Sequence, residues 1–285
     1  MQKTWFITGS SRGFGRSLVV AALAAGDQVV ATARRPEVLA ALDHPNLLAV
    51  ALDVTDPGAV ERALQQGTER FGRLDVIVNN AGYANVAAIE SATEQDFRAQ
   101  FETNFWGVYN VSKAAVPLLR EQGGGLIVQF SSVGGRVGGS PGIASYQAAK
   151  FAVDGFSRVL AVETAPFGVK VMVIEPSGFR TDWAGASMTV HDVPAEYEST
   201  VGAMNARIRQ NDAGSAGDPD RAAEIIVQAA HRENPPTHLP LGVNAVEMSL
   251  AYSQRQIAEA TAWEKVSRSA DFAEPYPATF PADVA

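Results

Sequence analysis

The sequence predicts a single α/β domain built on a doubly wound parallel sheet, because short apolar runs alternate with longer helical ones to about residue 175. The runs are nearly continuous in Val, Ile, Leu, Ala and Phe, which is typical of strands buried on both faces of a parallel sheet. A glycine-rich turn directly after the first run is the third observation. The predicted strands are 4–8, 28–33, 47–52, 76–79, 126–130 and 169–174.

Start and stop signals place helices between these strands. Asp-Pro pairs at 56–57 and 218–219 each give an N-cap followed by proline in the first turn, where a missing N–H costs nothing. Thr93 precedes a short acidic turn, which is favourable at the positive end of a helix dipole. Gly26 predicts the end of the helix between the first two strands.

The chain of 285 residues suits one large domain, which we expect to span 1–265. Within it, residues 179–216 are rich in Gly, Ser, Thr and Met and are expected to form a long irregular lid over a substrate. Residues 266–285 contain prolines and are expected to be a weakly structured tail.

Composition excludes several classes of function. A net charge of -8 argues against nucleic-acid binding, which needs clustered Lys and Arg. The absence of cysteine excludes disulfides and thiolate catalysis, and the four histidines lack metal-ligand spacing, so no metal site is expected. No stretch approaches the roughly 18 apolar residues of a membrane span, and the start is too short for a signal peptide, so we expect a cytoplasmic location.

The glycine-rich turn leads from the first strand into an apolar helix expected from about Arg16. Close approach of backbone to a pyrophosphate requires positions without a Cβ, with the N–H groups of the helix start aimed at the oxygens. The spacing Gly-x-x-x-Gly-x-Gly is wider than the common dinucleotide fingerprint, and an ordinary strand–helix turn is the alternative. The turn residues predicted to hold the nucleotide are Gly9, Ser11, Arg12, Gly13, Phe14 and Gly15.

The end of the second strand indicates which nucleotide would bind. A carboxylate there selects NAD, whereas Arg neutralises the 2′-phosphate of NADP. Arg34 and Arg35 stand at this place, and no acid occurs before Glu37. The sequence therefore predicts NADP(H), the alternative being that both arginines are solvated surface charges.

Three residues could move a proton to or from a carbonyl oxygen. Tyr146 and Lys150 are one helical turn apart, so their side chains share a face. A phenol, with a pKa of about 10, needs its anion stabilised to work at neutrality, and we expect the Lys150 ammonium to lower that pKa. Ser132, at the end of the fifth strand, could donate to the substrate oxygen. A Tyr-x-x-x-Lys pair alone is weak evidence, because a surface helix pair gives the same pattern.

Further motifs follow in one order along the chain: Asp53, Asn79-Asn80-Ala81-Gly82, Asn104, Ser132, Tyr146 with Lys150, and Pro176 with Thr181. Together with the turn, they resemble the short-chain dehydrogenase/reductase family in its single-domain branch, over about residues 3–182. The resemblance implies a Rossmann fold and hydride transfer between a nicotinamide and a ketone or secondary alcohol.

The resemblance also implies roles for single residues. Tyr146 would be the general acid or base, Lys150 would hold the nicotinamide ribose, and Ser132 would polarise the carbonyl. Asn104 would hold a water that links Lys150 to solvent. Without the family, the alternative for Asp53 is a helix cap shared with Asp56. The further residues implied to line the cofactor are Asp53, Val54, Asn80, Ala81, Gly82, Pro176 and Thr181, beside Tyr146 and Lys150.

Two positions depart from the family pattern. Ser177 follows the proline of the sixth-strand loop, where the family usually has glycine. The segment 133–142 is one residue longer than expected between the catalytic serine and tyrosine, so Ser131 is a lesser candidate for the serine role.

The predicted substrate is bulky and apolar, such as a steroid, retinoid, terpenoid or polyketide. Trp183, Met188, Tyr197 and Met204 lie in the expected lid, and Trp183 is expected to join Ser132 and Tyr146 at the substrate. Segments 132–136 and 151–156 resemble those of hydroxysteroid and retinol dehydrogenases. The aromatic residues could equally pack the lid or a subunit contact.

The resemblance also implies a homodimer or homotetramer, because the two long helices around the fifth strand commonly pair between subunits. The leading reading is an NADP(H)-dependent alcohol dehydrogenase or carbonyl reductase. A non-catalytic NADP(H) sensor of the same fold is the main alternative, although binding alone does not require Ser132, Tyr146 and Lys150. A sugar-nucleotide epimerase or dehydratase ranks lower, because those relatives usually have another glycine spacing and a larger C-terminal domain.

Overall fold

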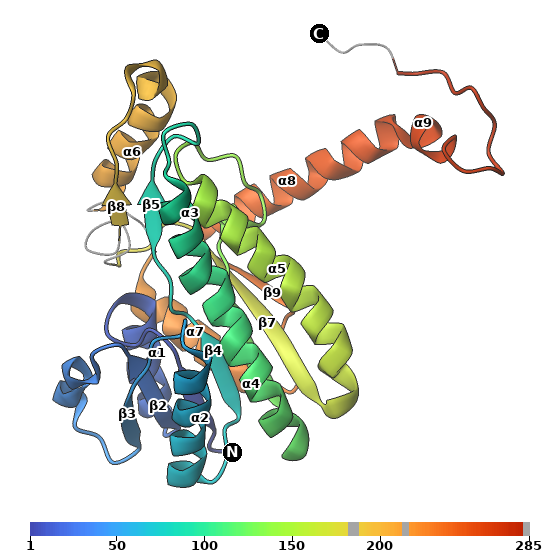
Figure 1. Cartoon of the computed structure of the whole chain (residues 1–285). Coiled ribbons are helices and arrows are strands. Elements are labelled where there is room, and N and C mark those ends of the chain that lie inside the picture. The colour runs from blue at the N-terminus through green and yellow to red at the C-terminus, as the bar shows by residue number, and fades with distance from the viewer. Residues whose placement is uncertain (182–187, 213–216, 282–285) are drawn as a thin grey trace.

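The computed structural model describes residues 1–181, 188–212 and 217–281. Its seven-stranded sheet is parallel throughout in the order β3-β2-β1-β4-β6-β7-β9, which confirms the doubly wound prediction (Figure 1). All six predicted strands are present. The sequence missed β9, whose run His-Leu-Pro-Leu reads poorly as a strand but suits the sheet edge that it forms. The strands are β1 Thr4–Ile7, β2 Gln28–Ala33, β3 Leu47–Ala51, β4 Val76–Asn79, β6 Gly125–Phe130, β7 Val169–Pro176 and β9 His238–Leu241.

Helices cover both faces of the sheet. One face packs against α1 (Gly13–Ala24) and α7 (Pro219–Ala230). The other face packs against α2 (Pro57–Phe71), α4 (Gly107–Glu121) and α5 (Ala144–Thr164), and α3 (Glu94–Phe101) precedes α4. The predicted N-caps are confirmed, because the side chains of Asp56, Thr93 and Asp218 accept hydrogen bonds from the first turns of α2, α3 and α7.

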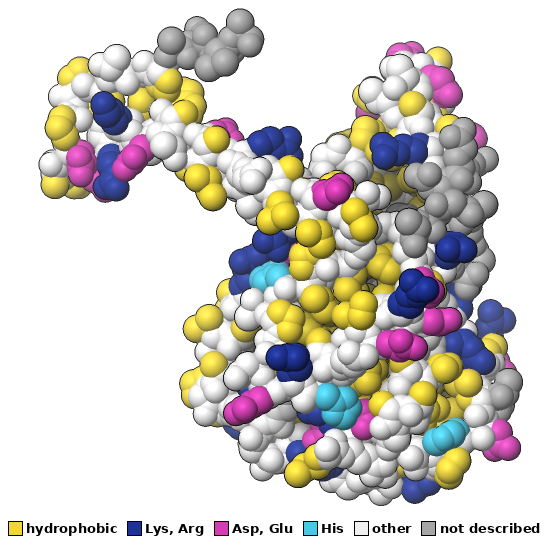
Figure 2. All heavy atoms as spheres, turned by 180° about the vertical axis from the view of Figure 1, so that it is seen from behind, with side chains coloured by type: hydrophobic (Ala, Val, Ile, Leu, Met, Phe, Trp, Pro, Cys, Tyr) yellow, Lys and Arg dark blue, Asp and Glu magenta, His cyan; other side chains and the backbone are white. Residues whose placement is uncertain are grey.

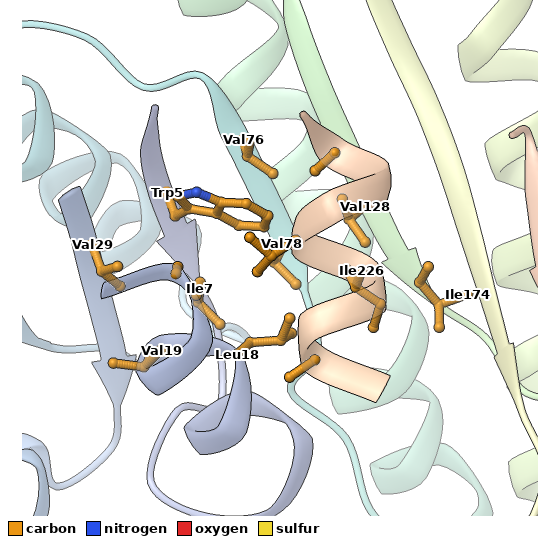
Figure 3. Packing of buried hydrophobic residues seen from close by; sticks show 14 of the residues in the cluster. Trp5, Ile7, Leu18, Val19, Val29, Val76, Val78, Val128, Ile174 and Ile226 are labelled. Atoms are coloured by element: carbon orange, nitrogen blue, oxygen red, sulfur yellow. The ribbon is translucent and has the colours of Figure 1, made fainter. Parts of the chain in front are cut away.

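Strand β1 shows why its sequence is continuously apolar. Trp5 and Ile7 point into the core under α1 and α7, where they lie with Leu18 and Ile226 (Figure 3). Phe6, between them, is buried in the core on the other face. A strand that is buried on both sides leaves no position for a polar alternation.

The expectation of an irregular segment over 179–216 is wrong. Strand β8 (Met188–Val190) pairs in parallel with β5 (Ala84–Val86), and α6 (Ala203–Asp212) follows. A bridge between Phe179 and Gly217 ties the two ends of the segment together. The local Gly and Ser content is overridden because a partner strand lies far away in the sequence. Trp183 lies outside the described residues.

The C-terminal part is more helical than expected. Helix α8 (Val243–Ala262) stands off the body of the molecule and leads to α9 (Glu264–Arg268), so the predicted boundary after residue 265 falls inside a helix (Figure 1). Residues 269–281 form no helix or strand. Among the helices that the structure describes, none is both long and apolar enough to cross a membrane.

Candidate functional site

The glycine turn lies between β1 and α1, which begins at Gly13 rather than near Arg16. Gly9 and Gly13 have φ of +67° and +52°, the left-handed region that favours glycine. A Cβ on Gly15 would lie 2.3 Å from the carbonyl oxygen of Gly9, so that position also requires glycine. The Asn80 amide fixes the turn by donating to the carbonyl oxygens of Thr8 and Gly9, at 2.9 and 3.1 Å.

The start of α1 is suited to an anion. Arg12 occupies the N-cap and makes no capping hydrogen bond with its side chain, and the first turn, all of which is described, contains no acidic residue. Helix N–H groups and the helix dipole therefore remain available to phosphate oxygens. Ser11 and Arg12 are exposed beside them. Thr181 lies across the turn, with its Cβ 3.4 Å from where a Cβ on Gly13 would be.

A hollow of about 530 Å³ lies at the ends of β2 and β3. Arg34 and Asp53, two of the residues predicted to contact the cofactor, line it together with Arg62 from α2, which the sequence analysis missed. Arg62 could have been found only by knowing that α2 folds back over the end of β3. Arg35 is exposed and is not part of this lining.

Asp53 does not share the N-cap of α2 with Asp56. Its Oδ1 accepts from the backbone N–H and hydroxyl of Thr55, at 3.0 and 2.8 Å, while Asp56 accepts from Ala59 at the helix start. Asp53 therefore closes a tight turn at the rim of the hollow. Val54, the next predicted residue, is buried, and its carbonyl accepts from Asn110 at 3.0 Å.

The three proton-transfer candidates meet where β6 and β7 end. Ser132 follows β6, and α5 places Tyr146 and Lys150 one turn apart. All three are buried, with exposed fractions of 9%, 8% and 4%. The Ser132 side chain interacts with the Tyr146 phenol and acts to lower its pKa. The Ser132 oxygen also accepts from the Gly134 N–H at 3.0 Å, which fixes its position.

The pKa of Tyr146 differs from the expectation. Burial raises the pKa of Tyr146 to about 12, against a smaller opposing effect of the Ser132 hydrogen bond. Burial has the opposite effect on the base Lys150 and lowers its pKa to about 8. The Lys150 ammonium donates to the Phe130 carbonyl at 2.5 Å and lies 5.8 Å from the centroid of the Tyr146 ring. The pKa of Tyr146 is therefore raised rather than lowered, and the cause is desolvation of the phenol.

The neighbouring serines have different partners. The Ser131 hydroxyl donates to the backbone carbonyl of Lys150 at 3.0 Å, so it ties β6 to α5. The close approach of these two elements also explains Gly135, where a Cβ would lie 2.4 Å from the Ser131 oxygen. Ser132 is the serine whose side chain interacts with the Tyr146 phenol.

Asn104 is fully buried in a π-helical turn, Glu102–Trp106, between α3 and α4. Its amide makes both possible bonds to the backbone of Tyr83, accepting from the N–H at 3.1 Å and donating to the carbonyl at 2.8 Å. A Cβ on Gly82 would lie 3.1 Å from the Asn104 oxygen and 3.7 Å from the Lys150 nitrogen. Asn104, Gly82 and Lys150 therefore converge, and π-helical turns are frequent at functional sites.

The remaining predicted residues lie at the same edge of the sheet. The N–H groups of Asn80 and Ala81 donate to the Thr8 hydroxyl, and Pro176 ends β7 opposite Leu241. Phe14 packs its ring against Phe130 and Phe179.

Ser177 has a structural explanation. Its backbone N–H donates to the Leu241 carbonyl at 3.1 Å, which joins the ends of β7 and β9. None of the described residues other than glycine has a positive φ, so the backbone at 177 does not require glycine.

Apolar side chains pack around Tyr146. Val86, Ile143 and Val201 are buried with it, and Met188 and Tyr197 pack against this cluster. These last two residues belong to the segment that the sequence predicted to contact an apolar substrate.

A cluster of charged side chains that the sequence did not predict lies where α5, β7 and β9 meet. The ligand-type atoms of Asp154, Glu175 and His238 lie within 4.8 Å of one another. Arg136 donates to Glu175 at 2.9 Å, and His238 lies 2.7 Å from Asp154. Burial raises the pKa of Glu175 against the pull of Arg136. The hydrogen bonds of His238 and Arg158 outweigh burial at Asp154 and hold its pKa below the usual value.

Asp154→Asn is expected to lower the free energy of unfolding at pH 7 by about 1–3 kcal/mol, because the hydrogen-bonded charge is lost. A depressed carboxyl pKa stabilises the fold above its unfolded value and ceases to do so as the pH falls through the folded value. Urea titrations from pH 7 downward should therefore show a steeper acid loss in the wild type than in Asp154→Asn. Parallel pH curves would contradict this role.

The comparisons agree with this geometry. The family profile of short chain dehydrogenases matches residues 3–190. Oxidoreductase BOA17 of Botryotinia fuckeliana is 48% identical over 271 residues, covering 94% of this chain and 98% of that protein.

Two solved structures show the same fold. A short-chain dehydrogenase from Streptomyces avermitilis has a TM-score of 0.87 and 40% identity over 95% of this chain and 100% of its own. An alcohol dehydrogenase from the archaeon Thermococcus sibiricus, complexed with 5-hydroxy-NADP, has a TM-score of 0.69 and 26% identity over 85% and 96%. The profile match over residues 3–190 and the nearly full-length relative establish that this chain belongs to the short-chain dehydrogenase/reductase family of oxidoreductases.

Proposed function

We propose that the protein is an NADP(H)-dependent carbonyl reductase or alcohol dehydrogenase that acts on a bulky apolar ketone or secondary alcohol. The observation that carries the proposal is the buried hydroxyl pair of Tyr146 and Ser132, with Lys150 beside it, at the edge of an apolar cluster. Neither nucleotide binding nor folding by itself calls for this arrangement.

Tyr146 is the proton donor in reduction. With a pKa of about 12 it is fully protonated at neutral pH, so its hydroxyl can give a proton to a substrate oxygen as negative charge develops there. Ser132, held by the Gly134 N–H, donates a second hydrogen bond to that oxygen. In oxidation the Tyr146 hydroxyl would first have to lose its proton to solvent, and the resulting tyrosinate oxygen would then accept the proton of the alcohol. Bound NADP(H) supplies or takes the hydride.

Lys150 and Asn104 keep this centre in place. The ammonium bond to the Phe130 carbonyl fixes the Lys150 side chain beside Gly82. Asn104 holds the backbone of Tyr83, so it positions the chain that passes Lys150. Lys150 would face the ribose hydroxyls of the nucleotide.

The cofactor is expected to lie along the glycine turn, with its pyrophosphate at the N-terminus of α1 and its adenosine end in the hollow. The uncapped helix start and the glycines that admit no Cβ fit a phosphate group. Arg34 and Arg62 line the hollow with Asp53, and Arg62 also lies 3.8 Å from Asp56. Arg34 is therefore the cation that we assign to the additional phosphate of NADP(H). The complex of the T. sibiricus relative with 5-hydroxy-NADP supports this assignment.

Arg34→Ala is expected to raise the KM for NADPH by about 10–100-fold and to leave the KM for NADH within about threefold, because only NADPH loses an ion pair to its 2′-phosphate. Initial rates with both nucleotides measure the change. Arg35→Ala is the matched control, because Arg35 is exposed but does not line the hollow. An equal loss with both nucleotides in Arg34→Ala would contradict NADP(H) selection.

The apolar walls support the substrate class. Met188 and Tyr197 pack with Tyr146 in a cluster of buried apolar side chains. A panel of steroid, terpenoid and aliphatic ketones, followed by NADPH fluorescence, tests the proposal. A sensor protein would bind NADPH and show no turnover with any ketone.

Assembly and location complete the proposal. We expect a homodimer or homotetramer in the cytoplasm, with α4 and α5 forming one contact. Phe151, Val159 and Val162 on α5 are 41%, 57% and 77% exposed, which supports a contact surface there.

A further inference from the structure

The C-terminal arm, defined here as residues 243–281, has almost no support from the rest of the chain. Within α8 only Ala245 and Ser249 are buried, and both lie near its start. Every residue from 254 to 265 is exposed. A helix of 20 residues is about 30 Å long, and most of the stability of such a helix in a protein comes from tertiary packing. The outer turns of α8 therefore need a partner surface to pack against if they are to be stable.

One face of α8 carries an unpartnered apolar stripe. Val243, Val246, Leu250 and Ile257 are 72%, 45%, 60% and 67% exposed. At about 100° per residue, these four side chains fall within about 60° of one another around the helix. The stripe lies about 100° round from the buried Ala245 and Ser249, so it runs beside the face that contacts the body. Figure 2 shows apolar side chains gathered where the arm leaves the body and along the arm.

The tip of the arm is aromatic. Trp263 makes an edge contact with Phe280 at 5.9 Å between ring centroids, so the end of the chain folds back on the helix. Phe272 and Tyr276 are almost fully exposed. Large aromatic side chains are enriched in protein interfaces because they bury much area at little cost in side-chain entropy.

The charge of the arm favours a protein partner over a lipid surface. The arm contains five acidic and three basic residues, a net charge of -2, and the whole chain carries -8. Helices that bind anionic membranes have polar faces rich in Lys and Arg, which this helix lacks. The apolar stripe itself contains no charge, so two copies of it can meet without like charges in the contact.

A second copy of the stripe would not be enough by itself. A helix about 30 Å long and about 10 Å wide presents only about 300 Å². A stable interface needs about 800 Å² from each partner. The aromatic tip must therefore also be covered, and a two-fold arrangement covers both tips at once because each arm reaches the body of the other copy.

We propose that the C-terminal arm is exchanged between two copies of this chain. Helix α8 pairs antiparallel with α8 of the second copy through Val243, Val246, Leu250 and Ile257, and the aromatic tip of each arm lies on the other body. This contact is separate from the one proposed for α4 and α5, and it does not depend on the reaction that the site performs.

The first test compares two double variants by light scattering. Leu250→Glu with Ile257→Glu places charge in the stripe and is expected to halve the mass of the assembly. Ala251→Glu with Ala258→Glu adds the same charge to exposed positions about 100° round the helix and is expected to keep the wild-type mass. Circular dichroism checks that both proteins are folded. An unchanged mass in the first variant, or a monomeric wild type, overturns the proposal.

The second test uses the absence of cysteine from the chain. Leu250 lies midway between Val243 and Ile257, so a two-fold axis brings it close to its own counterpart. Leu250→Cys is expected to give a disulfide-linked dimer under mild oxidation, and Ala251→Cys is expected to stay unlinked. Equal linking of both variants, or of neither, counts against the antiparallel pair.

The third test examines a membrane as the alternative partner of the stripe. It uses vesicles of phosphatidylcholine and phosphatidylglycerol. Wild-type protein should remain in the supernatant after the vesicles are sedimented. Sedimentation that Leu250→Glu with Ile257→Glu abolishes would assign the stripe to a membrane and overturn the proposal.

Discussion

Tyr146→Phe is expected to lower kcat for ketone reduction by about 10²–10⁴-fold, because it removes the proposed proton donor and leaves the aromatic ring in place. KM for the ketone should change little, since most of the contact area remains. Loss of the buried hydroxyl and of its interaction with Ser132 should cost only about 0.5–1.5 kcal/mol of folding stability. Steady-state oxidation of NADPH measures kcat, and a fluorescence titration shows whether NADPH still binds.

Tyr252→Phe is the matched control for this change, because Tyr252 lies in α8, outside the proposed site. Its kcat should equal that of the wild type. If Tyr146→Phe retained a kcat within about tenfold of the wild type, the proton would have to come from another group and the proposed mechanism would be wrong.

Ser132→Ala should lower kcat by about 10²–10³-fold, the loss that follows when a donor to a developing oxyanion is removed. Ser131→Ala is its neighbouring control. The Ser131 hydroxyl donates to the Lys150 carbonyl, so that variant should lose about 1 kcal/mol of stability and keep most of its kcat. The two variants differ only in which hydroxyl is absent, so the comparison separates a substrate contact from a structural bond.

The readouts are kcat with a ketone identified in the panel and the free energy of unfolding in urea. A larger loss of kcat in Ser131→Ala than in Ser132→Ala would reverse the assignment of the two serines. Similar losses of kcat in both would indicate that the variants act through the packing of α5 against β6.

The strands could be predicted from the sequence because a strand that is buried on both faces is apolar at nearly every position. Six strands were predicted, each as a run with hardly any polar residue. The caps at Asp56, Thr93 and Asp218 could also be predicted, since a cap and the N–H groups that it accepts from are a few residues apart. Strand β9 was missed because an edge strand with a proline has no such pattern.

Elements that depend on distant partners were harder to predict. The pairing of β8 with β5 joins segments that are far apart in the chain, and the Gly and Ser content around β8 gives no hint of it. Arg62 enters the hollow beside Arg34 only because α2 packs back over the end of β3. Asp154, Glu175 and His238 likewise come from α5, β7 and β9.

The sequence by itself determined the order of the strands along the chain, the glycine turn, and the placing of Tyr146 and Lys150 on one helix face. Each of these follows from backbone geometry over a few residues. Only the tertiary structure decided that Ser132 lies at the Tyr146 phenol and that burial raises the pKa of Tyr146. It also decided that α8 leaves the body. These properties depend on burial, which is the sum of contacts from many segments, and no short stretch of sequence contains that sum.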